Sequence, residues 1–415
     1  MKFGLNKYFI LAIITLKVIL IYLLNSELNL VPDEQDAYNI AENIVNLGKQ
    51  VIHNDFSNSL QLTARRGAGN IFLYSFLITN QIKISAFVLG YYILYIFLFV
   101  WSVSSFNKIL KFYEIDDKLI KIAVLVYCLY PSSLYYIGTK PFWENFAVCV
   151  LVIFFQLFIT NSQKWYINSI VALLALFSMI LRPHCMPIFV FLSIVFVYRK
   201  YLTKANMIIL IIMLFFYSII NCLLIVRNQK YTGYKTSTTQ IGFELLQGHN
   251  PDARGSWRFY NYQTDTNNVI HKFFKSKIPN SNFNNEFEQS KLRQNVAIQW
   301  AINNPIKEIE ITLRKVAIFF LPQNFELDQS SSWWNPINLV IHIGFIFYLF
   351  LMMIYREKRT FNHYLLIVPF ICSIAISIIF FTGYRWRFYC EPFMIISAFV
   401  FVNKYKRILF QLRAV

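Results

Sequence analysis

Charged residues are scarce in this chain: they make up 14% of its 415 residues, whereas 57% are hydrophobic. A soluble domain averages about 25% charged and 45–50% apolar residues. Acidic residues are the scarcest, with 21 Asp and Glu against 39 Lys and Arg, so the formal net charge is +18. This composition excludes an ordinary soluble domain. Long apolar runs separated by short basic stretches instead predict a polytopic, all-α membrane protein.

Several functional motifs are also missing. The sequence has no HExxH, P-loop or paired-cysteine pattern, so zinc-peptidase, ATPase and redox functions have no support. Its six cysteines lie in or beside apolar runs without CxxC spacing, which favours packing over disulfides or metal binding. The basic residues lie mostly at the ends of apolar runs, where they act as topology signals. We therefore expect no metal, no cofactor and no nucleic-acid partner.

Ten apolar runs are candidate membrane-spanning helices, and basic residues indicate their orientation. The first run follows Lys2 and Lys7 without a small-residue cleavage motif behind it, so we expect a retained helix. The basic residues of alternate connections fall on the same side as both termini, which makes that side cytoplasmic. The runs are 8–25, 84–106, 119–138, 143–160, 165–182, 184–198, 206–226, 336–355, 362–382 and 388–403.

The extracytoplasmic side receives the two longest polar segments. The apolar run 306–322 is predicted to be an interfacial or re-entrant helix, because an eleventh span there would put Arg356-Glu357-Lys358-Arg359 outside. The run 69–80 is expected to lie on the outer surface. The spans hold almost no ionisable residues. The predicted parts are an N-terminal membrane module 1–226 with its first outer loop 26–83, an extracytoplasmic region 227–335, and C-terminal membrane helices 336–415.

An acidic run, Pro32-Asp33-Glu34-Gln35-Asp36-Ala37-Tyr38, directly follows the first span. Residues 33–47 have the spacing of an amphipathic helix lying in the membrane interface, and Gly48 is placed to end it. A carboxylate held there can deprotonate an acceptor hydroxyl as a general base. It can equally be a helix start, with Asp33 capping free N–H groups. The pattern leaves both interpretations open.

Basic residues near the spans on the outer side are exceptions to the usual charge bias. A phosphate group at the membrane surface would account for several of them, since guanidinium groups bind phosphate at two points. Lipid headgroups, or salt bridges to Asp33, Glu34, Glu144 and Glu391, would account for them as well. These basic residues are Arg65, Arg66, Lys140, Arg182, Arg227, Arg254, Arg258, Arg314, Lys315, Arg385 and Arg387.

Two more motifs carry candidate polar groups. In Pro141-Phe142-Trp143-Glu144-Asn145, the carboxylate of Glu144 can orient an acceptor, pair with an outer arginine or cap the helix. The stretch after the seventh span contains Gly248-His249-Asn250-Pro251, whose polar turns can hydrogen-bond sugar hydroxyls. A metal or catalytic role for His249 has little support, because it is a lone histidine.

These residues together resemble the GT-C class of polytopic glycosyltransferases. That class includes the protein O-mannosyltransferases, the aminoarabinose transferase of lipid A and bacterial family-39-like enzymes. Their first outer loop typically carries an Asp-Glu pair followed by a Tyr, which Asp33, Glu34 and Tyr38 match. The chain departs from the family at Arg65-Arg66-Gly67-Ala68-Gly69, where a proline-containing turn is usual. Other similar segments are Tyr130-Pro131, Leu181-Arg182-Pro183, Arg227 to Gly255, Trp300 to Pro305 with Lys315, and Arg385-Trp386-Arg387.

The resemblance implies a GT-C fold with about 10–11 transmembrane helices in a cell membrane and an extracytoplasmic active site. It implies transfer of a sugar from a polyprenyl-phosphate donor to a glycan, lipid or protein acceptor. Asp33 would be the general base and Glu34 would orient it or the acceptor. Alternatives are a non-enzymatic transporter or flippase, which would need charged residues inside the spans, and a polysaccharide polymerase of unrelated fold. Substrate would contact Tyr38, Arg66, Glu144, Arg182, His249, Asn250, Lys315, Arg385 and Arg387.

Overall fold

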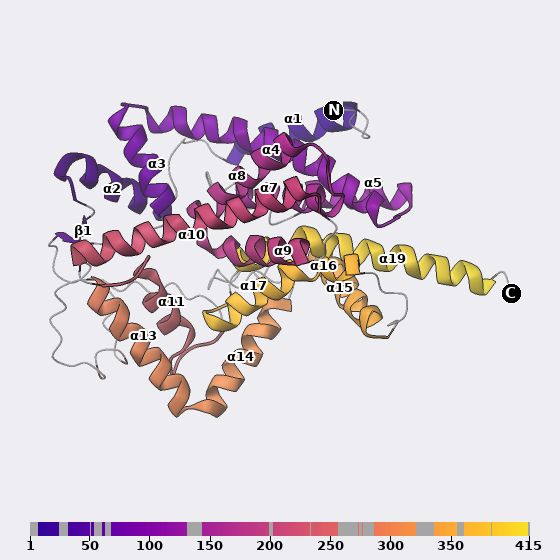
Figure 1. Cartoon of the computed structure of the whole chain (residues 1–415). Coiled ribbons are helices and arrows are strands. Elements are labelled where there is room, and N and C mark those ends of the chain that lie inside the picture. Colours follow the sequence, from indigo (N-terminus) through magenta and orange to yellow (C-terminus); the bar gives the residue numbers. More distant parts are fainter. Residues whose placement is uncertain are drawn as a thin grey trace.

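Helices account for nearly all the regular structure in the computed structural model (Figure 1). A single pair of short strands is the exception among the described residues. The structure describes residues 7–24, 32–49, 51–53, 60–62, 68–130, 143–198, 202–232, 234–255, 273, 276, 286–320, 336–354, 361–382 and 384–413.

The helices follow the apolar runs of the sequence. The first half of the chain forms α1 (Lys7–Leu24), α2 (Pro32–Leu47), α3 (Ala68–Thr79), α4 (Ile84–Phe112), α5 (Asp117–Cys128), α7 (Trp143–Ile159), α8 (Trp165–Leu181), the 3-10 turn η1 (Pro183–Cys185), α9 (Met186–Tyr198) and α10 (Lys204–Thr232). The second half forms α11 (Gln240–Gly248), α13 (Glu286–Asn303), α14 (Pro305–Phe320), α15 (Pro336–Ile354), α16 (Phe361–Leu365), α17 (Val368–Ile379), α18 (Tyr384–Phe388) and α19 (Glu391–Arg413).

Local sequence explains several helix ends. The carboxylate of Asp116 accepts a 2.8 Å hydrogen bond from the amide of Lys118 and so caps the start of α5. Pro32 is the first residue of α2 and Pro305 the first of α14, the position at which a missing N–H is harmless. Gly48, with φ +65°, follows α2 as predicted.

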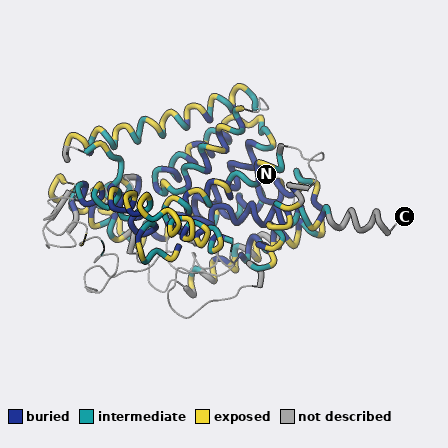
Figure 2. Tube along the Cα trace, turned by 90° about the horizontal axis from the view of Figure 1, so that it is seen from below, coloured by how far each residue is buried: buried dark blue, intermediate teal, exposed yellow. Residues whose placement is uncertain are grey.

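Helix α7 forms the centre of the bundle. All of its residues from Trp143 to Phe158 are buried, and it packs against α4, α8, α9 and α18. Figure 2 shows this burial as dark blue at the centre, with exposed segments on the outer helices. Its mixture of Phe, Val, Ile and Leu on every side is what a helix surrounded by other apolar helices requires.

Three helices of the described chain are long and apolar enough to cross a membrane, judged by length and composition. They cover Ile84–Phe112, Lys204–Lys230 and Asn362–Ile379. Further apolar helices are shorter, at Gly69–Thr79, Trp143–Ile159, Trp165–Leu181, Pro183–Tyr198 and Leu339–Phe350. Membrane character is thus supported, whereas the number of spans stays a prediction. Helix α1 begins and α19 ends on the same side of the bundle, the right side of Figure 1.

The polar end of the molecule carries α11, α13 and α14 together with the two strands. Strands β1 (Val51–His53) and β2 (Leu60–Leu62) pair antiparallel, with Val51 opposite Leu62. Helices α11 and α13 pack so closely that a Cβ at Gly242 would lie 2.0 Å from the carbonyl oxygen of Ser290. Glycine is therefore required at this crossing.

Candidate functional site

The first pair of the candidate site joins two predicted contact residues. Arg182 follows the last residue of α8, and its Nε donates to Oε2 of Glu144 at the start of α7 over 3.0 Å. The Glu144 side chain is 2% exposed and that of Arg182 is 12% exposed. The sequence left three roles open for Glu144, and the structure shows that it pairs with Arg182. Burial makes this pair sensitive to the loss of either member.

A second buried pair lies at the junction of α18 and α19. Arg387 donates from Nε to Oε1 of Glu391 over 3.3 Å, and the two side chains are 3% and 1% exposed. Its Nη1 also donates to the carbonyl oxygen of Phe319 over 3.4 Å, in the last turn of α14. Both arginines therefore have a carboxylate partner, as the salt-bridge alternative predicted for the outer basic residues.

The turns that carry the two arginines are in contact. The ring of His184, two residues after Arg182, lies 4.3 Å from the ring of Trp386, centroid to centroid. Trp386 precedes Arg387 directly, and α18 also packs on α7. Motifs that are about 200 residues apart in sequence thus meet at one end of the bundle.

A third group forms where α14 meets the end of α17. Lys315 is fully buried, and its Nζ donates to the carbonyl oxygen of Ile378 over 2.9 Å. His249 places Nε2 2.7 Å from the carbonyl oxygen of Ile379 and Nδ1 2.8 Å from Oε1 of Glu308. Burial of the Lys315 ammonium lowers its pKa from 10.5 to about 8, although the carboxylate of Glu308 opposes the shift.

Backbone contacts lock this third group to the bundle. The hydroxyl of Thr382 donates to the carbonyl oxygen of Lys315 over 2.8 Å. The backbone amide of Thr382 donates to the carbonyl oxygen of Gly255 over 2.7 Å. A Cβ on Gly248 would lie 1.5 Å from the carbonyl oxygen of Phe380. The predicted polar loop therefore packs directly on the segment that leads from α17 to α18.

Asn250 has a local structural role. Its side-chain amide donates to the carbonyl oxygens of Leu246 and Gln247 over 2.8 and 3.0 Å, and its Oδ1 accepts from the amide of Asp252 over 2.9 Å. These bonds close the turn after α11. The residue is fully buried, so its predicted sugar contact would require displacement of these bonds.

The acidic run forms the first turns of α2, as the sequence predicted. The side chains of Asp33 and Glu34 lie outside what the structure describes, as does that of Arg385 in α18. Arg66 and the predicted basic residues Arg65, Lys140 and Arg258 lie outside the described residues altogether.

A series of aromatic rings links α2 to the start of α7. Tyr38 contacts Tyr74 at 5.9 Å, Tyr74 contacts Phe87 at 5.7 Å, and Phe87 contacts Trp143 at 6.2 Å between ring centroids. Trp143 is adjacent to Glu144 in sequence. The acid-bearing helix is thereby connected by packed rings to the first Arg–Glu pair.

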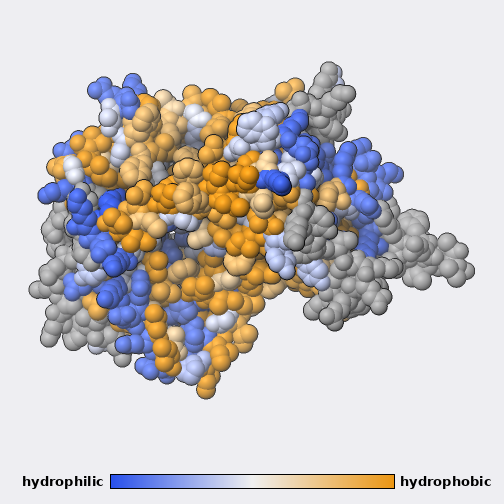
Figure 3. Space-filling model, in the orientation of Figure 1, coloured by the Kyte–Doolittle hydropathy of each residue, from blue (hydrophilic) through white to orange (hydrophobic). Residues whose placement is uncertain are grey.

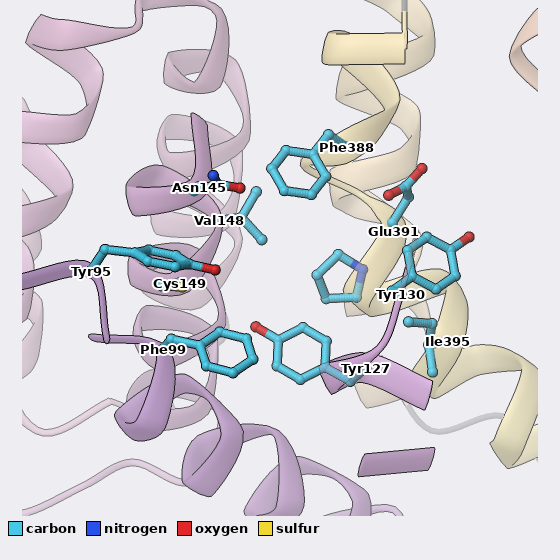
Figure 4. A pocket seen from close by; sticks show the side chains of 11 residues that line it. Tyr95, Phe99, Tyr127, Tyr130, Asn145, Val148, Cys149, Phe388, Glu391 and Ile395 are labelled. Atoms are coloured by element: carbon cyan, nitrogen blue, oxygen red, sulfur yellow. The ribbon is translucent and has the colours of Figure 1, made fainter. Parts of the chain in front are cut away.

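A pocket lies beside the second Arg–Glu pair (Figure 4). In Figure 4 the polar ends of Tyr95, Tyr127 and Asn145 turn toward its middle. In the described part of the chain, Asn145 Oδ1 and the Tyr130 hydroxyl are buried without a hydrogen-bond partner. The residues around it come from four parts of the fold: Tyr95, Phe99, Tyr127, Tyr130, Asn145, Val148, Cys149, Phe388, Glu391, Pro392 and Ile395.

Sequence reasoning missed two polar residues that the fold brings inside. Glu308 was not singled out, although it partners His249. Lys17 lies within the first predicted span, is 1% exposed, and places its Nζ 4.6 Å from the ring centroid of Phe99. Its position in an otherwise apolar run was the available signal. The expectation that the spans are almost free of ionisable groups needs this correction.

No group of three or more His, Cys, Asp or Glu that could hold a metal occurs among the described residues. No family model, no curated protein and no solved structure matches the chain. The function is therefore argued from the chemistry of these residues.

Proposed function

We propose that the protein is a membrane glycosyltransferase of GT-C architecture with ten membrane spans. It would transfer a sugar from a polyprenyl-phosphate donor to an acceptor hydroxyl on the extracytoplasmic face. The observation that carries the proposal is the contact between the turns of two arginines that each have a carboxylate partner, where the ring of His184 packs on that of Trp386. Cations that are already oriented and shielded from water stabilise a developing phosphate charge far better than solvated ones.

The donor phosphate would bind at the outer faces of Arg182 and Arg387, with Arg385 of the same short helix as a third cation. Arg182 retains 12% exposure, which leaves it accessible to a ligand. Lys315 would act from behind this surface, because α14 reaches Arg387 through the carbonyl oxygen of Phe319. The carboxylates of Glu144 and Glu391 hold the two guanidinium groups in fixed orientations.

The sugar would use the polar groups of the neighbouring pocket, whose cavity of about 20 Å³ would have to widen to admit a sugar ring. Buried polar atoms without a partner are costly unless a ligand or water satisfies them. Among the described residues, Asn145 Oδ1 is such an atom, and it turns toward the middle of the pocket, whereas the Tyr130 hydroxyl points away from it (Figure 4). Aromatic walls at Tyr95, Tyr127 and Phe388 suit the apolar faces of a sugar ring.

The reaction would be one inverting displacement. Asp33 takes the proton of the acceptor hydroxyl while that oxygen attacks the anomeric carbon. The bond from the anomeric carbon to the phosphate oxygen breaks, and the lipid monophosphate leaves with the electron pair. Glu34 would orient Asp33 or the acceptor, and Tyr38 would contact the substrate one helical turn further along.

The test is Asp33→Asn, assayed in membranes with synthetic polyprenyl-phosphate hexoses and pentoses. We expect loss of sugar transfer by at least about 100-fold, since general base catalysis contributes roughly 10²–10⁴-fold. Asp36→Asn, on the same helix, is the matched control and should retain activity. Full activity of a normally folded Asp33→Asn protein would refute the proposed base.

One observation supports the transporter alternative. Lys17 is a buried cation within the first membrane helix, and charges inside spans often mark transport paths. Replacement by Met separates the two functions. If the protein is a transferase, Lys17→Met should keep sugar transfer measured with solubilised donor and acceptor. If it is a flippase, the same substitution should abolish movement of a fluorescent polyprenyl-phosphate sugar across proteoliposomes.

A further inference from the structure

The hairpin of α13 and α14 carries an exposed apolar edge. The two helices meet at a tip around Asn304 that lies away from the rest of the bundle (Figure 1). The edge consists of five aliphatic side chains that are between 49% and 82% exposed: Ile298, Ile302, Ile306, Ile309 and Leu313. Within each helix the members are three or four residues apart, so Ile298 and Ile302 share one face of α13, and Ile306, Ile309 and Leu313 share one face of α14.

The opposite face of α14 is anchored in the protein. Ile311, Lys315 and Phe319 are buried there, at 6%, 0% and 1% exposure. Phe320, in the last turn, packs its ring 5.2 Å from that of Phe370 in α17. The helix therefore enters the apolar bundle at its carboxyl end, while its amino-terminal half projects outward with the edge.

In water such an edge would be an unpaired aliphatic patch, which soluble surfaces avoid. Figure 3 shows hydrophobic atoms that continue from the bundle to the lower tip of the molecule, where this hairpin lies. The apolar edge stops at Ile298, because Asn295 and Lys291 occupy the same face of α13 one and two turns earlier. The apolar surface is thus confined to the tip and is continuous with the apolar exterior of the bundle.

The charges beside the edge match a lipid surface. Lys307 follows Ile306 and Arg314 follows Leu313, so both basic groups flank the edge. Of the neighbouring carboxylates, Glu308 contacts His249, whereas Glu310 pairs with Arg314 itself, so Lys307 is the basic group beside the edge that is offered to lipid phosphates. Aliphatic residues with basic flanks are the pattern of a helix that lies in a membrane interface.

We propose that the α13–α14 tip docks into the outer leaflet of the bilayer through this five-residue edge. The occupant is lipid, with acyl chains against the isoleucines and Leu313, and a headgroup phosphate at Lys307. Docking would hold α14 from its exposed side, while its buried side presents Lys315 to the end of α17. The surface is independent of the proposed transferase activity.

Fluorescence quenching in lipid nanodiscs tests the proposal. The full chain carries Cys222→Ala, because Cys222 is the exposed cysteine of the described chain and the others described are buried. A polarity-sensitive dye is attached at Ile306→Cys or Leu313→Cys, and the lipids carry a nitroxide near the top of the acyl chain. Lys291→Cys, on the same face of α13 beyond the edge, is the matched control.

We expect the dye at positions 306 and 313 to be quenched at least about threefold more than the dye at position 291. Equal quenching at all three positions would overturn the proposal, because the edge would then have no defined depth. Blue-shifted emission at 306 without lipid quenching would also overturn it, since a second protein copy would then cover the edge. Ile306 is 82% exposed, so the label itself displaces no packed neighbour.

Discussion

Lys315 and His249 bind consecutive carbonyl oxygens at the carboxyl end of α17. Nζ of Lys315 contacts the carbonyl oxygen of Ile378, and Nε2 of His249 contacts the carbonyl oxygen of Ile379. The two nitrogens are 3.4 Å apart. The last carbonyls of a helix lack partners within it and form the negative end of its dipole, where cations are favoured. Both residues therefore act as caps of α17 in this state, and substrate binding by Lys315 would compete with this capping.

The buried ammonium of Lys315 should make stability depend on pH. Its pKa is about 8 in the folded protein against 10.5 when unperturbed. Between these values the unfolded chain binds more protons than the native one, so the free energy of unfolding should rise with pH, by about 3 kcal/mol at most. Below pH 8 the full penalty is present, and above pH 10.5 no further gain is expected.

Unfolding in detergent at pH 7.5 to 10.5 measures this rise. Lys315→Met should abolish it, whereas Lys307→Met, at an exposed position on the same helix, should preserve it. Wild-type and Lys315→Met curves with the same slope would show that burial of this ammonium carries no penalty.

The Glu144–Arg182 pair should tolerate joint replacement better than single replacement. Glu144→Gln removes the carboxylate from a buried guanidinium, for which we expect a loss of about 3–5 kcal/mol. The double variant Glu144→Gln with Arg182→Met should recover most of that loss in thermal unfolding. Sugar transfer should fall in Glu144→Gln, whose guanidinium loses its fixed orientation, and should be absent in the double variant, because the proposed phosphate site needs Arg182. Recovery of activity in the double variant would exclude Arg182 from that site.

Gly248 should not accept a side chain. A Cβ there would lie 1.5 Å from the carbonyl oxygen of Phe380, so Gly248→Ala must displace the loop from the end of α17. Gly90→Ala is the control, because a Cβ on Gly90 meets nothing within 4 Å and alanine favours the helix by roughly 0.5–1 kcal/mol. Limited proteolysis should cleave the loop that contains position 248 faster in Gly248→Ala than in the wild type. In Gly90→Ala the rate of cleavage should be unchanged.

Two substitutions of Tyr38 test its ring and its hydroxyl separately. Its ring packs edge-on against Tyr74, so Tyr38→Ala should lower the unfolding temperature and Tyr38→Phe should not. If the hydroxyl contacts substrate, as the family resemblance implies, Tyr38→Phe should still reduce transfer about tenfold, the value of one hydrogen bond near 1.4 kcal/mol. Unchanged transfer in Tyr38→Phe would limit this residue to packing.

Helix positions were predictable because long apolar runs and proline or glycine boundaries decide them. Helix α2 was expected over 33–47 and is Pro32–Leu47. The run 119–138 was wrong in its length, because α5 ends at Cys128. The run 362–382 is divided into α16 and α17 by a turn at Leu366 and Ile367.

The partners of the polar residues were less predictable. For Arg182 and Arg387, phosphate binding and salt bridges were both open from the sequence, and only the fold shows that Glu144 and Glu391 lie against them. Strands β1 and β2, each three residues long, had no periodicity to reveal them. Burial of Lys17 depends on which face of α1 meets Phe99, and a run that is apolar on every side cannot specify that face.

The ring contacts from Tyr38 to Trp143 affect how the proposed site responds to salt concentration. Contacts between aromatic rings do not weaken with added salt, whereas interactions between exposed charges do. The spacing between α2 and the first Arg–Glu pair should therefore be the same in dilute and concentrated electrolyte. Any ionic-strength dependence of activity would then report how the charged substrate arrives, and not a change in the distance between the groups that act on it.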